Sequence, residues 1–227
     1  MNQSLTQKIR DDFDRLALYD RNEWNHNNHY HRFLLKQLPS KCQTVLDLGC
    51  GTGEFSRLLA ERADEVTALD LSPNSIQIAR QRSQQFKNIN YQIADISRWD
   101  FAPEYFEAIA SIATFHHLSL EQLVPKLKAA LKPGGVLIVL DLLEHHNFKD
   151  TLSDAIAVPL NWWLLKVNNR HIKPNPEAVA AMKEHLRTDR FLNLSQAKKI
   201  YASLLKNATV RRHLFWRYSV VWQKPII

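Results

Sequence analysis

Three glycines alternate through a short loop that follows an apolar run, in the stretch VLDLGCGTGEF at residues 45–55. Asp47 precedes this loop and Glu54 follows it. Turns of this kind usually hold phosphates at a helix N-terminus, but a dinucleotide fingerprint requires a glycine where Glu54 stands, and a P-loop requires a lysine. Carboxylates on both sides of the turn favour a ligand that lacks phosphate and carries positive charge.

Two further carboxylates end the next two predicted strands, Asp70 in ALDLS and Asp95 in IADIS. Each aspartate alone is more often a helix cap or a loop residue than a ligand. Together with Asp47, however, they end three successive strands, and the carboxyl ends of such strands form the ligand-binding edge of an open α/β sheet. Asp70 can bind both ribose hydroxyls of a nucleoside, and Asp95 is within plausible reach of an adenine amino group. S-adenosylmethionine, a nucleoside with a sulfonium and an ammonium group, fits these residues.

Strands and helices alternate from residue 44 onward, which predicts an α/β fold with a doubly wound sheet. Amphipathic helices are expected before this region, and a helix with two antiparallel edge strands is expected after it. The predicted strands are 44–48, 65–71, 90–95, 106–112, 135–143, 210–216 and 218–224, and the predicted helices are 5–20, 27–39, 54–63, the segment after Ser72–Pro73, 121–131 and 194–207.

The chain resembles the class I S-adenosylmethionine-dependent methyltransferases, particularly the small-molecule branch of the ubiquinone-biosynthesis type. VLDLGCGTGEF, ALDLS, ADIS, ATFHHL at 113–118 and LKPGGVLIVLD at 131–141 carry the resemblance. It implies a Rossmann-like seven-stranded sheet with a reversed last strand, within a single domain. That domain would comprise an N-terminal helical cap (1–40), a cofactor-binding core (41–144), a helical substrate-side insertion (145–192), and a C-terminal helix with edge strands (193–227).

The resemblance also implies a set of cofactor-binding residues in the glycine loop, at the strand ends and in the cap. The residues of the glycine loop line the methionine and ribose parts of the cofactor. The aspartates at the strand ends bind the ribose and the edge of the adenine, and the tyrosines approach from the N-terminal helices. These residues are Asp47, Gly49, Cys50, Gly51, Gly53, Asp70, Leu71, Asp95, Ile96, Ala113, Tyr19 and Tyr30.

Catalysis needs little from the protein, because the sulfonium methyl group is already activated and must mainly be aligned with the acceptor. His116 and His117 follow the fourth strand and are candidate bases, since histidine titrates near neutral pH. The alternative is that either histidine packs in the loop and shapes it. His145, Trp162 and Trp163 are candidate acceptor-binding residues, although adjacent tryptophans cannot both face inward on one regular element.

Two clusters contain residue types that can bind a metal ion: HNNHYH (His26, His29, His31) and EHH (Glu144, His145, His146). His26 and His29 could share a helix face, but His31 could not, and no nearby carboxylate completes a ligand set. We therefore expect no metal site in the protein.

The basic charge is concentrated in the last third of the chain, where residues 166–227 hold 13 Lys and Arg against 3 Asp and Glu. This asymmetry is compatible with a solvated face, an acidic substrate or a nucleic acid. We expect a small-molecule acceptor, with Arg170 or Lys173 nearest to it, and no stable nucleic-acid partner. Methylation of a peptide, protein or RNA is the alternative, and a non-catalytic binding module is less favoured because the cofactor motif is intact.

The chain shows no secretory signal and no apolar run long enough to cross a bilayer. Cys42 and Cys50 are too few for a disulfide framework and are expected to be reduced thiols. We therefore expect a cytoplasmic protein, either a monomer or a homodimer.

Overall fold

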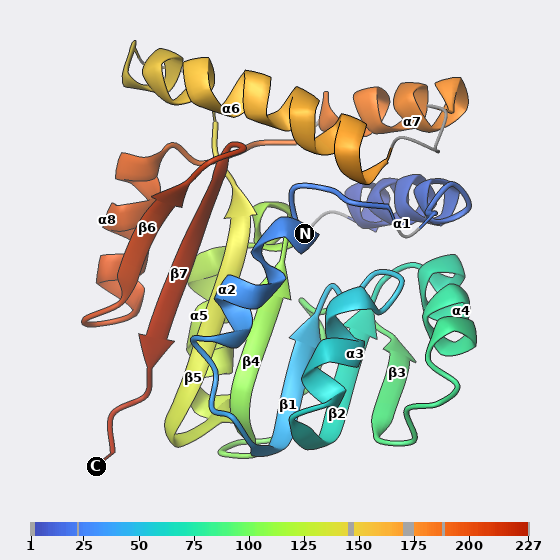
Figure 1. Ribbon diagram of the computed structural model, residues 1–227. Coiled ribbons are helices and arrows are strands. Elements are labelled where there is room, and N and C mark those ends of the chain that lie inside the picture. The colour runs from blue at the N-terminus through green and yellow to red at the C-terminus, as the bar shows by residue number, and fades with distance from the viewer. Residues whose placement is uncertain (1–2, 22, 145–147, 170–174, 188, 227) are drawn as a thin grey trace.

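A seven-stranded sheet with the strand order β3-β2-β1-β4-β5-β7-β6 forms the centre of the molecule (Figure 1). The computed structural model describes residues 3–21, 23–144, 148–169, 175–187 and 189–226. Strands β1 to β5 are parallel, and β7 runs antiparallel to both β5 and β6. The predicted sheet with a reversed last strand is confirmed. The strands are β1 (Cys42–Leu48), β2 (Ala63–Asp70), β3 (Ile89–Ile93), β4 (Phe106–Ile112), β5 (Leu131–Leu142), β6 (Thr209–His213) and β7 (Arg217–Gln223).

Helices cover both faces of the sheet. One face packs against α2 (His31–Leu35), α3 (Glu54–Ala60) and α4 (Pro73–Arg82), and the other against α5 (Leu120–Ala130) and α8 (Leu194–Leu204). Strand β5 contains a continuous apolar run because both of its faces are buried there. Leu137 and Val139 enter the core on the α5 and α8 side, whereas Ile138 and Leu140 enter the core on the α2 and α3 side.

Three helices lie across the carboxyl ends of the strands: α1 (Gln3–Ala17), α6 (Phe148–Asn168) and α7 (Pro176–Leu186) (Figure 1). Short 3-10 helices, η1 (Asn28–Tyr30) and η2 (Phe115–His117), complete this end of the molecule. The segment between β5 and α8 is thus largely helical where the structure describes it. In the same described ranges, no helix has the length and apolar character needed to cross a membrane.

The end of α1 and the segment after it are held onto the core by two aspartates. Asp14 accepts hydrogen bonds from the Ser72 hydroxyl at 2.6 Å and from the Asn74 backbone N–H at 3.0 Å, at the N-terminus of α4. Asp20 pairs with Arg82 at 2.8 Å and also accepts a hydrogen bond from the Thr52 hydroxyl in the glycine loop. These contacts place the N-terminal cap directly over the loop.

Candidate active site

The glycine loop between β1 and α3 follows a path that only glycine adopts without strain. Gly49 has a φ angle of +72° and Gly51 one of +53°. A Cβ atom at Gly49 would lie 2.0 Å from the Thr114 hydroxyl, so the loop packs tightly against the segment after β4. At Gly51 a Cβ atom would meet nothing within 4 Å, so the loop backbone is open there to an approaching ligand.

Asp70, the last residue of β2, fixes the shape of the loop. One carboxylate oxygen accepts a hydrogen bond from the Gly51 N–H at 2.8 Å, and the other accepts one from the Ser72 N–H at 2.8 Å. Each carboxylate oxygen can accept more than one hydrogen bond. Asp70 can therefore hold the loop and still accept hydrogen bonds from two ligand hydroxyls.

A cavity of about 310 Å³ opens between the loop, the strand ends and the N-terminal cap. Its volume lies at the lower end of the range of small-molecule sites. The structure brings nine of the twelve predicted cofactor residues together around it. These are Asp47, Gly49, Cys50, Gly51, Asp70, Leu71, Asp95, Ile96 and Ala113.

Burial controls the ionisation of two of these side chains. Asp47 is 2 % exposed, and its burial, together with the nearby Asp70 carboxylate, raises its pKa to about 7, although the Ser56 hydroxyl donates to it at 2.5 Å. Burial, followed by the charges of Asp70 and Asp47, raises the pKa of the Cys50 thiol well above its usual value. The Cys50 thiol is therefore uncharged, and Cys50 lines the cavity without acting as a nucleophile.

The other three predicted cofactor residues do not line this cavity. A Cβ atom at Gly53 would lie 2.3 Å from the Tyr91 hydroxyl, so this glycine serves the packing of α3. Tyr30 is buried in the core and donates a hydrogen bond to the Leu214 carbonyl at 2.9 Å. Tyr19 donates to Glu177 of α7 at 3.0 Å and borders a second cavity, described below.

The N-terminal cap contributes cavity residues that no sequence motif marks. Polar residues of the segment after α1 line one side, and apolar residues of α1 cover it. Burial, with the Arg57 charge as a smaller contribution, lowers the pKa of His31 to about 4, so this ring is neutral at physiological pH. The cap residues that line the cavity are Thr6, Ile9, Phe13, Asp20, Asn25, Asn27 and His31.

The two candidate catalytic histidines occupy different environments. His117 lines the cofactor cavity, and burial together with the charges of His116 and His185 lowers its pKa to about 2. His116 does not line this cavity. Its Nδ1 forms a 2.6 Å hydrogen bond with Asp141 of β5, and its ring borders a separate small cavity. Of the two histidines, the structure thus places His117, and not His116, at the 310 Å³ cavity.

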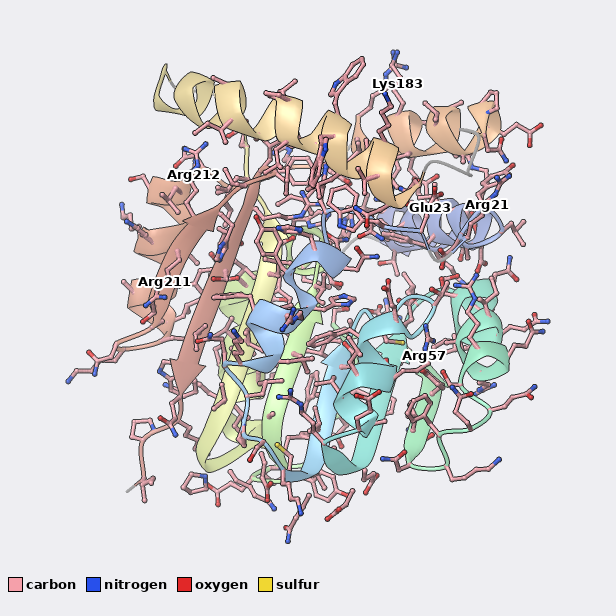
Figure 2. All side chains as sticks on the ribbon, in the orientation of Figure 1. Arg21, Glu23, Arg57, Lys183, Arg211 and Arg212 are labelled. Carbon is pink, nitrogen blue, oxygen red and sulfur yellow. The ribbon has the colours of Figure 1, made fainter. Side chains whose placement is uncertain are left out.

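A second cavity of about 940 Å³ lies between the segment after α1 and helices α6 and α7. Tyr19, Trp24, Leu165, Met182 and Leu186 supply apolar surface. Four basic residues and one acidic residue also line it, and Figure 2 shows Arg21, Glu23 and Lys183 on this side of the molecule. Asn25 is in the lining of both cavities, so the two are neighbours. The charged lining residues are Arg21, Lys166, Lys183, Arg187 and Glu23.

The predicted acceptor residues are not found in this lining. Trp162 and Trp163 are 75 % and 59 % exposed and line neither cavity, because in the described part of this region only Leu165 and Lys166 near the end of α6, and Asn169 just after it, border the larger one. The expectation that they form the acceptor pocket is therefore not supported by their placement. His145, and likewise Arg170 and Lys173, lie outside the described residues.

Two arginines of the basic last third lie far from both cavities. Figure 2 shows Arg211 and Arg212 beside β6, on the other side of the molecule from Arg21 and Lys183. These two arginines are thus remote from the site, whereas Lys166, Lys183 and Arg187 of the same basic third line the larger cavity.

Residues 45–135 match the family model described as Methyltransferase domain. An uncharacterized methyltransferase of Mycobacterium tuberculosis is 29 % identical over 216 residues, which cover 89 % of this chain and 98 % of the relative. The demethylmenaquinone methyltransferase of Tropheryma whipplei is 32 % identical over 150 residues, which cover 63 % of this chain and 62 % of the relative. The ubiquinone biosynthesis O-methyltransferase of Coxiella burnetii is 32 % identical over 128 residues, with 56 % and 54 % covered.

Solved structures of methyltransferases share the fold. A complex of DhpI with S-adenosylhomocysteine (SAH) superposes with a TM-score of 0.65 at 18 % identity, covering 99 % of this chain and all of the other. A phosphoethanolamine N-methyltransferase of Haemonchus contortus, in complex with phosphomonomethylethanolamine and SAH, superposes with a TM-score of 0.63 at 18 % identity, covering 87 % of this chain and 52 % of the other. At 18 % sequence identity, these superpositions show a shared fold and nothing further.

Proposed function

We propose that this chain, which is an S-adenosylmethionine-dependent methyltransferase with the class I fold, methylates an apolar small molecule that carries an acidic group. The observation that carries the proposal is the pair of neighbouring cavities that share Asn25 in their linings. The smaller one fits the cofactor, because it contains the glycine loop and the strand-end aspartates. The larger one is available for the acceptor.

The lining of the larger cavity defines the acceptor class. Aromatic and aliphatic side chains from the cap, α6 and α7 favour an apolar body. Arg21, Lys166, Lys183 and Arg187 outnumber Glu23 and favour an acidic group, since opposite charges attract strongly in a partly desolvated site. Arg170 and Lys173, which are expected nearest to the acceptor, lie outside the described residues, so we propose that the four cations that border the cavity favour the acidic group.

Methyl transfer at this site requires alignment more than acid–base chemistry. The residues of the smaller cavity would hold S-adenosylmethionine, which would supply an activated methyl group to an acceptor atom in the larger cavity on the side of Asn25 and leave as SAH. Any proton on the acceptor atom would be lost to solvent. The acceptor atom is O, N or C. Of the two candidate catalytic histidines, only His117 lines the cofactor cavity and is placed to contact the reacting atoms. His116 instead holds the loop in place through its hydrogen bond with Asp141.

The known substrate class of two relatives, as their names give it, supports a small acceptor. One acts on demethylmenaquinone, and another is an O-methyltransferase of ubiquinone biosynthesis. One of the fold neighbours is a complex with the small molecule phosphomonomethylethanolamine. The two cysteines of the chain are free and buried, which agrees with the proposed cytoplasmic location.

The proposal predicts which acceptors receive a labelled methyl group. The protein is incubated with methyl-labelled S-adenosylmethionine and with matched pairs of compounds that share an apolar body and differ only in an acidic group. We expect transfer to apolar compounds, and at least about tenfold higher kcat/KM for the acidic member of a pair, because one added ionic hydrogen bond contributes about 1.5–3 kcal/mol.

The same screen includes peptides, total protein and RNA as acceptors. Preferential labelling of RNA, with binding that weakens steeply as salt increases, would replace the small-molecule proposal by the macromolecular alternative. Equal labelling of acidic and neutral small acceptors would contradict the role of the four cations.

A further inference from the structure

We propose that His116, His117 and Asp189 form a binding site for a divalent transition-metal ion, with Zn²⁺ as the preferred ion. Each of the three residues offers one ligand atom, and these atoms all lie within 4.8 Å of one another. Two imidazoles and one carboxylate are typical ligands of Zn²⁺, which also binds with three protein ligands and one open position.

The distances within this cluster fit ligands around an ion better than hydrogen-bonded partners. His117 Nδ1 lies 3.5 Å from one Asp189 oxygen, and His116 Nε2 lies 3.8 Å from the other. Neither pair is a good hydrogen bond. Two atoms that each lie about 2.0–2.1 Å from a tetrahedral Zn²⁺ ion are separated by roughly 3.3–3.4 Å. A small inward shift of these side chains would give that separation.

The carboxylate of Asp189 is buried and incompletely satisfied by the surrounding protein. Its side chain is 5 % exposed, and its Oδ2 atom makes no hydrogen bond among the described residues, although His185 Nε2 lies 3.3 Å from it. A buried carboxylate oxygen without a partner is costly, because burial removes its hydration. A bound cation would satisfy this oxygen and neutralise the charge.

A neighbouring carboxylate orients one of the two ligand histidines, as carboxylates do in known metal centres. Asp141 hydrogen bonds to His116 Nδ1, and this contact leaves Nε2 as the nitrogen that faces Asp189. His185 of α7 lies beside the ligand set, with Nε2 3.3 Å from Asp189 Oδ2 and Nδ1 3.3 Å from Asp12 of α1. Asp12 and His185 thus connect the proposed site to the N-terminal cap.

The position of the cluster suggests what the ion does. His116 and His117 belong to η2, after β4, whereas Asp189 follows α7. An ion bound to all three residues would fasten the α7 region to the edge of the sheet where the cofactor binds. His117 also lines the cofactor cavity. The ion would therefore stabilise the closed arrangement of helices over the two cavities.

Metal content tests this site without reference to methyl transfer. Protein freed of any affinity tag is stripped with a chelator, dialysed against Zn²⁺, and measured by elemental mass spectrometry. We expect about one Zn²⁺ per chain and a rise in melting temperature on binding, since an ion that binds only the folded state stabilises it. Replacement by Co²⁺ should give the visible absorption typical of a tetrahedral site.

Two variants and a matched control complete the experiment. Asp189→Asn and His117→Gln should each weaken Zn²⁺ binding at least about tenfold, because each removes a ligand. His29→Gln removes an exposed histidine outside the cluster and should bind Zn²⁺ as the wild type does. Far-UV circular dichroism establishes that each variant is folded.

Three results would overturn the proposal. Folded wild-type protein could remain free of both Zn²⁺ and Co²⁺, both folded variants could bind them as well as the wild type does, or His29→Gln could lose as much binding as they do. The first measurement needs no variant, so the proposal stays testable even if Asp189→Asn does not fold.

Discussion

Replacing Asp70 by alanine is expected to weaken the binding of S-adenosylmethionine and of SAH by about 100-fold or more. The carboxylate ends β2, holds the Gly51 and Ser72 N–H groups at 2.8 Å, and lines the cofactor cavity. The variant would lose two hydrogen bonds to the ribose, and hydrogen bonds to a charged group contribute about 1.5–3 kcal/mol each. Isothermal titration calorimetry with SAH measures the change.

Asp64→Ala provides a matched control for this variant. Asp64 lies on the same strand, near its opposite end, and is exposed. It changes the net charge equally without touching the cavity, so its affinity for SAH should equal that of the wild type. If Asp70→Ala is folded and binds SAH within about twofold of the wild-type affinity, the assignment of Asp70 to the ribose is wrong.

Replacing Ala178 by tryptophan is expected to lower kcat/KM for the methyl acceptor about 100-fold while leaving the affinity for SAH unchanged. Ala178 of α7 lines the 940 Å³ cavity and does not line the cofactor cavity. A tryptophan there would displace the acceptor from alignment with the methyl group, and a displacement of about 1 Å can cost roughly 100-fold in rate. Initial rates, measured with an acceptor found in the labelled-methyl screen, give the comparison.

Ala180→Trp separates occlusion of the cavity from a general effect of tryptophan on α7. Ala180 is exposed on the same helix and does not line either cavity. Its rate should stay within about threefold of the wild-type rate, because surface substitutions usually have small effects. Equal rates for Ala178→Trp and the wild type would show that the acceptor binds elsewhere.

The cofactor side of the site could be predicted because its signals are local in the sequence. A glycine that needs a positive φ angle and an aspartate at a strand end each show their role within a few residues. Gly49 and Asp70 are examples, and both line the cavity as expected. The doubly wound sheet followed from the alternation of strands and helices, and its seven strands with a reversed last strand followed from the family resemblance.

The acceptor side could not be predicted, because it is formed by contacts between distant segments. Asn25 matters through its position between two cavities, and no spacing in the sequence marks it. Trp162 and Trp163 looked like pocket residues by type, but the helix that carries them extends past the cavity. Asp189 lies over 70 residues from His117 in the chain, so their proximity appears only in the folded structure.

A crystal structure of the protein with bound SAH would test the assignment of the two cavities to cofactor and acceptor. We expect density for the nucleoside in the 310 Å³ cavity, with the ribose hydroxyls at Asp70, the adenine beside Leu71 and Ile96, and the sulfur facing Asn25 and the larger cavity. Density for the nucleoside at any other place, or a sulfur turned away from the larger cavity, would contradict this assignment.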